Sequence, residues 1–113
     1  MDMKSKNKRK SPLTFKELRK ANTKRCEKHF HKLESWTPTD WACALAGEVG
    51  ELCNFIKKKR RGDKIPLSDI AKECADVQCY LDLLSASLSI SLEEATIDKF
   101  NEVSDRKNCK IKL

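Results

Sequence analysis

The spacing of the apolar residues constrains the fold of this chain more than any other feature of its sequence. Three glycines and three prolines among 113 residues leave few places where a helix must break. No segment alternates apolar and polar residues with the period of two that a half-buried strand requires. Between residues 68 and 90 the apolar positions instead recur at intervals of three or four, as one helix face requires: Ile70, Cys74, Val77, Leu81, Leu84 and Leu88. The sequence therefore predicts an all-α fold.

Capping signals mark where the helices begin. Thr14 is followed three residues later by Glu17, which is the spacing of a capping box. Thr37 precedes a proline, which suits the first position of a helix because its missing N–H is not needed there. Ser68 and Ser91 stand before the two remaining apolar stripes and are predicted to cap them. We expect four helices, over residues 14–33, 37–61, 68–90 and 91–105.

The length of the chain and the placement of its charge predict its organisation. A single domain of 113 residues leaves much of its surface wet, so association with further copies is expected. Residues 1–12 are basic and contain almost no apolar side chains, which predicts a disordered tail ahead of a helical domain over 13–113. No aromatic residues stand between these lysines to stack on bases, so nucleic acid is not expected as a partner.

The sequence shows neither a long apolar stretch nor a secretory signal. We therefore expect no association with a membrane and a cytoplasmic location. The cysteines form no CxxC pair, and several fall within apolar helical patterns, so we interpret them as buried, reduced side chains rather than as metal ligands. They are Cys26, Cys43, Cys53, Cys74, Cys79 and Cys109.

Two carboxylate pairs repeat in the second and third predicted helices. At an offset of 25 residues, Glu48 aligns with Glu73 and Glu51 with Asp76. Residues three apart on a helix are neighbours, so each pair places two carboxylates within reach of one cation. Each pair flanks an apolar stripe that is expected to be buried. In the second helix this stripe consists of Leu45, Val49, Leu52 and Ile56.

Four carboxylates facing one cleft would repel one another unless a cation neutralised them. Oxygen ligands without histidine or cysteine select Mg²⁺, with Mn²⁺ as a substitute, and open coordination positions suit phosphate chemistry. Acidic pairs at this spacing also arise by chance on solvated helices. Glu102 with Asp105 is such a pair, and we interpret it as surface.

Around these acids the sequence resembles the MazG-like family of all-α nucleoside triphosphate pyrophosphatases. The signature of that family is E-x-x-E, a spacer of variable length, and then E-x-x-D. It reads Glu48-Val49-Gly50-Glu51 and Glu73-Cys74-Ala75-Asp76 in this chain, and the similarity extends over residues 13–106.

The resemblance implies a four-helix MazG-like bundle completed by oligomerisation, as a homodimer or homotetramer. It implies Mg²⁺-dependent hydrolysis of nucleoside triphosphates to monophosphate and pyrophosphate, often as house-cleaning of the nucleotide pool. The four signature acids would be the metal ligands and the catalytic residues, with Glu48 as our first candidate for the general base because its neighbours are apolar.

The resemblance also implies residues that bind the substrate. Tyr80 matches a position near the base or sugar, and Lys99 and Arg106 match basic residues that meet phosphates. Asn101 stands close to where some relatives have an asparagine. The choice of base and of ribose or deoxyribose stays open.

Two further candidates come from the residues themselves. Trp41 lies about two turns before Glu48 and could line the mouth of a cleft, although packing in the core or at a hinge is the simpler interpretation for it and for Trp36. Lys57 is the best candidate for a phosphate contact within the cationic run 57–61, although cations at a helix C-terminus are favourable without any ligand.

Two other functions compete with the hydrolase. The chain could be a nucleotide-binding protein without catalysis, or a basic module that binds nucleic acid through its N-terminal lysines. Deleting residues 1–10 separates these ideas, since only the nucleic-acid module would lose salt-sensitive binding. A di-iron carboxylate bundle is disfavoured because the sequence contains no E-x-x-H motif.

Overall fold

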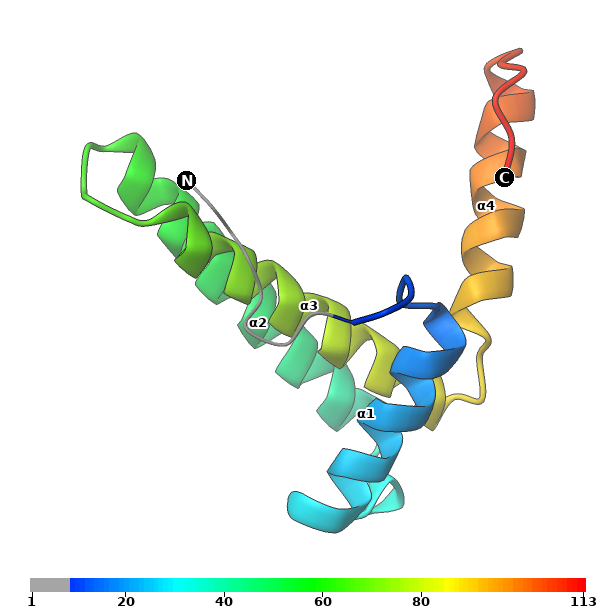
Figure 1. Cartoon of the computed structure of the whole chain (residues 1–113), viewed down its shortest axis with the longest axis horizontal. Coiled ribbons are helices and arrows are strands. Elements are labelled where there is room, and N and C mark those ends of the chain that lie inside the picture. The colour runs from blue at the N-terminus through cyan, green and yellow to red at the C-terminus, as the bar shows by residue number, and fades with distance from the viewer. Residues whose placement is uncertain (1–8) are drawn as a thin grey trace.

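The computed structural model describes residues 9–113, and within this range the chain is entirely helical, with no strand. The predicted all-α fold is thus confirmed. Helices α2 and α3 form a long antiparallel hairpin, α1 crosses α3 near the base of this hairpin, and α4 stands apart as a second arm (Figure 1). The elements are α1 (Phe15–His29), a short 3-10 helix η1 (Leu33–Ser35), α2 (Pro38–Arg60), α3 (Leu67–Ser87) and α4 (Leu92–Arg106).

Three of the four predicted helix starts are confirmed by their caps. The side chains of Thr14, Thr37 and Ser91 each accept a hydrogen bond from a backbone N–H in the first turn of their helix. The prediction that Ser68 caps α3 was wrong. The observed N-cap lies two residues earlier: it is Pro66, in an extended conformation and without a capping side chain, and Leu67 is the first helical residue.

The C-terminal ends of α1 and α3 were predicted a few residues too late. Helix α1 ends at His29, because the backbone N–H groups of Phe30 and His31 both turn back to the carbonyl oxygen of Cys26. Helix α3 ends at Ser87 rather than near residue 90. The predicted break after α2 is confirmed, since Gly62 has φ of 103°, a conformation that favours glycine.

The core lies where α1, α2 and α3 meet. Cys26, Trp41 and Leu83 are its buried members, and Trp41 is only 2% exposed. The indole N–H of Trp41 donates to the carbonyl oxygen of Leu33 over 3.3 Å, which fixes the ring against η1. Four half-buried side chains pack around this centre, namely Leu33, Trp36, Tyr80 and Leu84. The interpretation of Trp41 as a core residue is therefore confirmed.

A buried polar network joins α1 to α3. Asp82, only 1% exposed, accepts hydrogen bonds from Nε of Arg19 at 2.8 Å and from Nδ2 of Asn22 at 3.1 Å. The Asn22 amide also donates to the carbonyl oxygen of Cys79, and the Arg19 guanidinium donates to the carbonyl oxygen of Ile90. Because Ile90 lies between α3 and α4, the same arginine holds the beginning of α4 against α1.

Two predictions of burial were wrong. Val49 and Ile56, from the stripe of the second helix, are 39% and 48% exposed, because α3 covers only part of that face. Among the cysteines only Cys26 is buried, whereas Cys43, Cys53 and Cys74 are exposed. All six cysteines are free thiols.

The N-terminal segment is described only in part. Residues 1–8 of the predicted disordered tail lie outside the described range. Arg9 forms an ion pair with Glu17 in the first turn of α1, with 2.5 Å between the charged atoms. None of the helices in residues 9–113 combines the length and the apolar character needed to cross a membrane.

Candidate functional site

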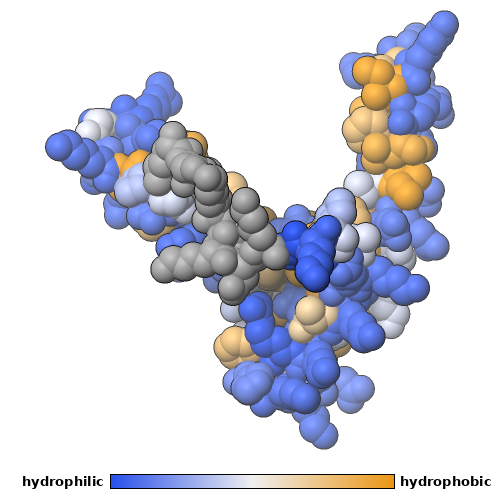
Figure 2. All heavy atoms as spheres, viewed as in Figure 1, coloured by the Kyte–Doolittle hydropathy of each residue, from blue (hydrophilic) through white to orange (hydrophobic). Residues whose placement is uncertain are grey.

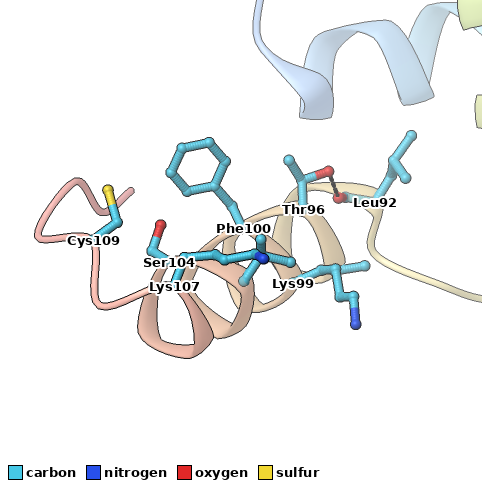
Figure 3. A pocket seen from close by; sticks show the side chains of 9 residues that line it. Leu92, Thr96, Lys99, Phe100, Ser104, Lys107 and Cys109 are labelled. Carbon is cyan, nitrogen blue, oxygen red and sulfur yellow. Dashed lines mark hydrogen bonds between the residues drawn. The ribbon is translucent and has the colours of Figure 1, made fainter.

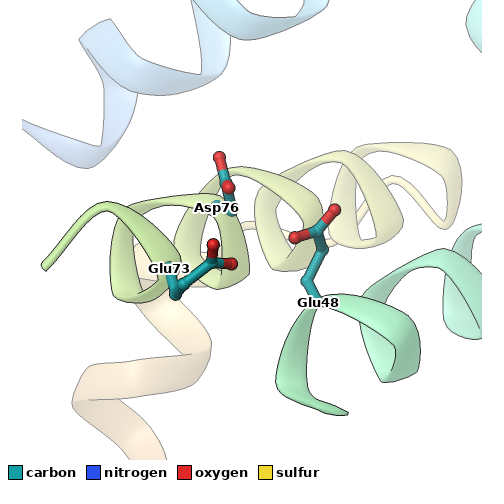
Figure 4. Close-up of side chains that lie close together, drawn as sticks. All are labelled: Glu48, Glu73 and Asp76. Carbon is teal, nitrogen blue, oxygen red and sulfur yellow. The ribbon is translucent and has the colours of Figure 1, made fainter. Parts of the chain in front are cut away.

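Three of the four predicted acids converge between the two helices of the hairpin. Glu48 comes from α2, and Glu73 and Asp76 come from successive turns of α3 (Figure 4). One carboxylate oxygen from each lies within 4.8 Å of the other two. The antiparallel packing of α2 on α3 produces this convergence, because the acids on both helices flank the stripes that meet.

The cluster is partly removed from water. Glu48 and Glu73 are half-buried and Asp76 is exposed. The Oε2 atoms of Glu48 and of Glu73 are buried without a hydrogen-bond partner among the described residues. A buried polar atom without a partner is destabilising and uncommon in folded proteins. These two oxygen atoms therefore mark a place that suits a hydrogen-bond donor or a cation.

The fourth acid, Glu51, lies at the edge of this cluster. Its side chain is exposed and does not belong to the group whose oxygens meet within 4.8 Å. It is nevertheless close enough to influence both half-buried glutamates. Burial raises the pKa of Glu48 and of Glu73 above the ordinary value, and the negative charge of Glu51 is the next largest cause for each. The charge of Asp76 raises both pKa values further.

The chemistry of this donor set fits a hard divalent cation. All of the donors are carboxylate oxygens, and no histidine or cysteine belongs to the group. Such ligands suit Mg²⁺ or Mn²⁺ rather than Zn²⁺. A cation would neutralise the mutual repulsion that raises the two pKa values, and it would satisfy the two orphaned oxygens.

A cavity of about 370 Å³ opens beside the carboxylates. Asp76 belongs both to the carboxylate cluster and to the wall of this cavity, so the two are continuous. Aromatic rings form much of the remaining wall. The ring of Trp36 lies 4.4 Å from that of His31 and 4.6 Å from that of Trp41, measured between centroids, and Tyr80 lies 6.3 Å from Trp41. The cavity therefore has an aromatic wall in which Trp36 and Tyr80 are partly exposed and Trp41 is buried.

Polar groups at the same cavity can orient a ligand. Arg25 on α1 lines it together with Asp76 of α3. Burial raises the pKa of the Tyr80 phenol, and the negative charges of Glu48 and Asp76 raise it further. The phenol therefore stays protonated at neutral pH and remains a hydrogen-bond donor.

The other predicted substrate residues lie away from this cluster within one chain. Lys57 is exposed and follows Glu48 by nine residues. At about 100° per residue this places Lys57 on the opposite side of α2. Lys99, Asn101 and Arg106 belong to α4, the separate arm in Figure 1.

Two of these α4 side chains have partners within that arm. Lys99 pairs with Glu102 at 3.1 Å, and the amide of Asn101 bonds the backbone of Leu113 through both its oxygen and its nitrogen. The paired acids Glu102 and Asp105 are exposed and bound to lysines, in agreement with their interpretation as surface.

Two residues that line the cavity could not be singled out from the sequence. Periodicity places Arg25 within the helical pattern of α1, and the spacing of His31 from His29 argues only against a paired metal site. His31 instead packs on the two tryptophans, with its Nδ1 at 2.9 Å from the carbonyl oxygen of Lys32. Neither position carries a local signal, because Arg25 joins the cavity through the packing of α1 on α3 and His31 joins it through its contacts with Trp36 and Trp41.

No protein-family model matches this chain, and no curated protein matches its sequence.

Proposed function

We propose that this chain is a Mg²⁺-dependent nucleoside triphosphate pyrophosphohydrolase of the MazG-like kind, which cleaves a triphosphate to the monophosphate and pyrophosphate. The observation that carries the proposal is the convergence of Glu48, Glu73 and Asp76 within 4.8 Å between two helices. Two orphaned carboxylate oxygens and an adjoining aromatic cavity support it. The expected role is house-cleaning of the cytoplasmic nucleotide pool.

The carboxylates would hold the cation. Glu48, Glu73 and Asp76 supply the converging oxygens, and Glu51 would complete the set from the edge of the cluster. Bound Mg²⁺ or Mn²⁺ would supply charge neutralisation for a polyphosphate that the acids alone would repel.

The residues around the cluster position the substrate. A nucleobase or sugar would occupy the cavity against the partly exposed rings of Trp36 and Tyr80, since flat rings favour stacking, whereas Trp41 is 2% exposed and supports this wall as a core residue. The protonated Tyr80 hydroxyl and the Arg25 guanidinium provide hydrogen-bond donors at the cavity. Because the cavity and the carboxylates share Asp76, a nucleotide held there extends its phosphates toward the acids. Most of the rate enhancement would come from this positioning and from charge neutralisation.

Glu48 is the candidate general base. Its carboxyl group is half-buried, and burial and the neighbouring acids raise its pKa above the ordinary value. Burial is the largest of these causes, and a cation that neutralises the neighbouring acids leaves this contribution in place, so the carboxylate can still accept a proton from water. Attack of that water on the α-phosphorus would expel pyrophosphate.

Residues outside the cavity belong to the proposal as phosphate contacts. Lys57, Lys99, Asn101 and Arg106 would act on a substrate only if a different arrangement of chains brings them to the carboxylates, since one chain places them elsewhere. A homodimer or homotetramer is accordingly part of the proposed function.

The test is a panel of nucleoside triphosphates incubated with the full chain and Mg²⁺, in which pyrophosphate and orthophosphate are measured separately. We expect pyrophosphate as the first product. Glu73→Gln and Glu51→Gln should abolish turnover with the helical content unchanged, whereas the control Asp105→Asn, an exposed acid on α4 paired with Lys112, should keep wild-type turnover. Release of orthophosphate first would refute the cleavage site. Nucleotide binding without turnover would indicate the non-catalytic alternative.

A further inference from the structure

Two hollows of the described chain differ in the polar groups of their walls. A groove of about 720 Å³ runs along α4 (Figure 3), and its wall is largely apolar, as the orange patch on this arm in Figure 2 shows. Within that groove the Thr96 hydroxyl donates to the carbonyl oxygen of Leu92 in its own helix. The cavity of about 370 Å³ beside the carboxylates is instead lined in part by Asn22, whose side chain is an amide. This second wall can therefore distinguish one polar ligand from another.

The Asn22 amide is held in one orientation by two acceptors. Its Nδ2 atom donates one hydrogen to the carbonyl oxygen of Cys79 at 2.8 Å and the other to Oδ2 of Asp82 at 3.1 Å. Exchanging the amide nitrogen and oxygen would place Oδ1 against these two oxygens, so the hydrogen bonds determine which atom is which. Arg19 in turn holds the Asp82 carboxylate at 2.8 Å. Both hydrogens of the amide are thus used within the fold.

The Oδ1 atom of the same amide has no partner in residues 9–113. Asn22 is only 4% exposed, yet its oxygen accepts no hydrogen bond from the described part of the chain. It does not belong to the fully enclosed oxygens without a partner, which are Oε2 of Glu48 and of Glu73, so a ligand can reach it. Because Asn22 lines the cavity, Oδ1 is a fixed hydrogen-bond acceptor recessed in its wall.

A recessed acceptor favours one kind of hydrogen-bond donor on a nucleobase. The exocyclic amino groups of cytosine, adenine and guanine project beyond the ring and can reach into such a wall. The ring N–H of uracil or thymine lies between two carbonyl oxygens, which would be brought toward the oxygens of Asn22 and Asp82. Charges of the same sign repel, so these two bases are disfavoured.

We propose that Oδ1 of Asn22 accepts a hydrogen bond from an exocyclic amino group of the base, which makes Asn22 a specificity-determining residue for amino-bearing nucleotides. The inference rests on the proposed function in placing a base in this cavity, and it requires neither metal binding nor hydrolysis. A ligand without the amino group would leave the recessed oxygen without a donor. A site built to bond such a group rejects an analogue that lacks it.

Titration calorimetry of the full chain with nucleoside monophosphates in Mg²⁺ tests the proposal without relying on turnover. Three pairs of ligands differ by one amino group: cytidine with pyrimidinone riboside monophosphate, adenosine with purine riboside monophosphate, and guanosine with inosine monophosphate. We expect an amino-bearing nucleotide to bind at least about 10-fold more tightly than its counterpart, and more tightly than uridine monophosphate. The pair with the largest difference identifies the base.

Variants assign this preference to the amide. Asn22→Ala should reduce the difference within that pair to less than about 3-fold, because the acceptor is removed. Asn54→Ala, which changes an exposed asparagine of α2, is the matched control and should keep the preference. Circular dichroism checks the fold of each variant. The ligand pairs remain decisive on the wild-type chain even where Asn22→Ala does not fold.

Several results would overturn the proposal. They are equal binding within every pair, no binding of any of these nucleotides, tighter binding of uridine monophosphate, and a preference that survives in folded Asn22→Ala. The two proposals fail in different ways. Release of pyrophosphate from triphosphates without the amino preference would refute the role of Asn22 alone, whereas the preference without hydrolysis would support that role and refute the proposed activity.

Discussion

Replacing Glu48 by glutamine should stabilise the metal-free protein and remove its response to Mg²⁺. The Glu48 carboxylate has three acidic neighbours: oxygens of Glu73 and Asp76 lie within 4.8 Å, and the charge of Glu51 raises the pKa of Glu48 more than that of either. At this separation each like-charged neighbour destabilises Glu48 by about 1 kcal/mol even at the dielectric constant of water. Glutamine keeps the size of the side chain and removes the charge. Its amide can also donate to a neighbouring carboxylate.

The expected gain in the free energy of unfolding is about 1–2 kcal/mol at pH 8 and low salt, because screening and partial protonation offset part of the repulsion. For a chain of this size the gain corresponds to a rise in Tm of about 4–8 °C. In the wild type, Mg²⁺ at ten times its dissociation constant should add about 1.4 kcal/mol. The Glu48→Gln variant should gain much less, because it has lost a ligand and the repulsion that the cation relieves.

The assay is thermal unfolding followed by circular dichroism in EDTA and in Mg²⁺, with NaCl added to equal ionic strength so that screening is the same in both. Asp105→Asn is the control, since an exposed acid paired with a lysine should change the stability by no more than about 0.5 kcal/mol. A lower Tm for Glu48→Gln in EDTA, or an undiminished response to Mg²⁺, would refute the assignment of a cation site.

Three more perturbations test other parts of the structure. In the metal-free protein the pKa values of Glu48 and Glu73 are raised, so the native state holds protons that the unfolded chain releases, and the free energy of unfolding should fall as the pH rises from about 4.5 through the raised pKa values. Urea unfolding in EDTA at several pH values measures this trend. A flat or opposite trend attributable to these acids would contradict it. Arg19→Ala should destabilise the fold by about 3–5 kcal/mol, since it leaves Asp82 as a buried charge without the guanidinium that pairs with it. Equilibrium urea denaturation would detect this loss. A change below about 1 kcal/mol would show that the ion pair does not stabilise the fold. Tyr80→Phe should raise KM for the triphosphate by about 5- to 10-fold with little change in Tm, because it removes one hydrogen-bond donor from the cavity. Steady-state kinetics would show this rise. An unchanged KM would place the substrate elsewhere.

The helices and the positions of the acids along them could be predicted without any structure. Helix starts depend on local chemistry, so Thr14, Thr37 and Ser91 could be recognised as caps from their neighbours alone. The pairing of Glu73 with Asp76 on one side of a helix follows in the same way from a spacing of three residues. These features depend on interactions within a few residues, which a single sequence displays directly.

Which groups meet across helices could be learned only from the way the helices pack. The antiparallel packing of α2 on α3 brings Glu48 to the acids of α3 and leaves Glu51 at the edge. The crossing of α1 over α3 builds the aromatic cavity and adds Arg25 to its wall. It also encloses Asp82 with Arg19 and Asn22 of α1. Contacts of this kind depend on the angle and offset between helices, which are set by packing over the whole chain and leave no periodic trace in either partner.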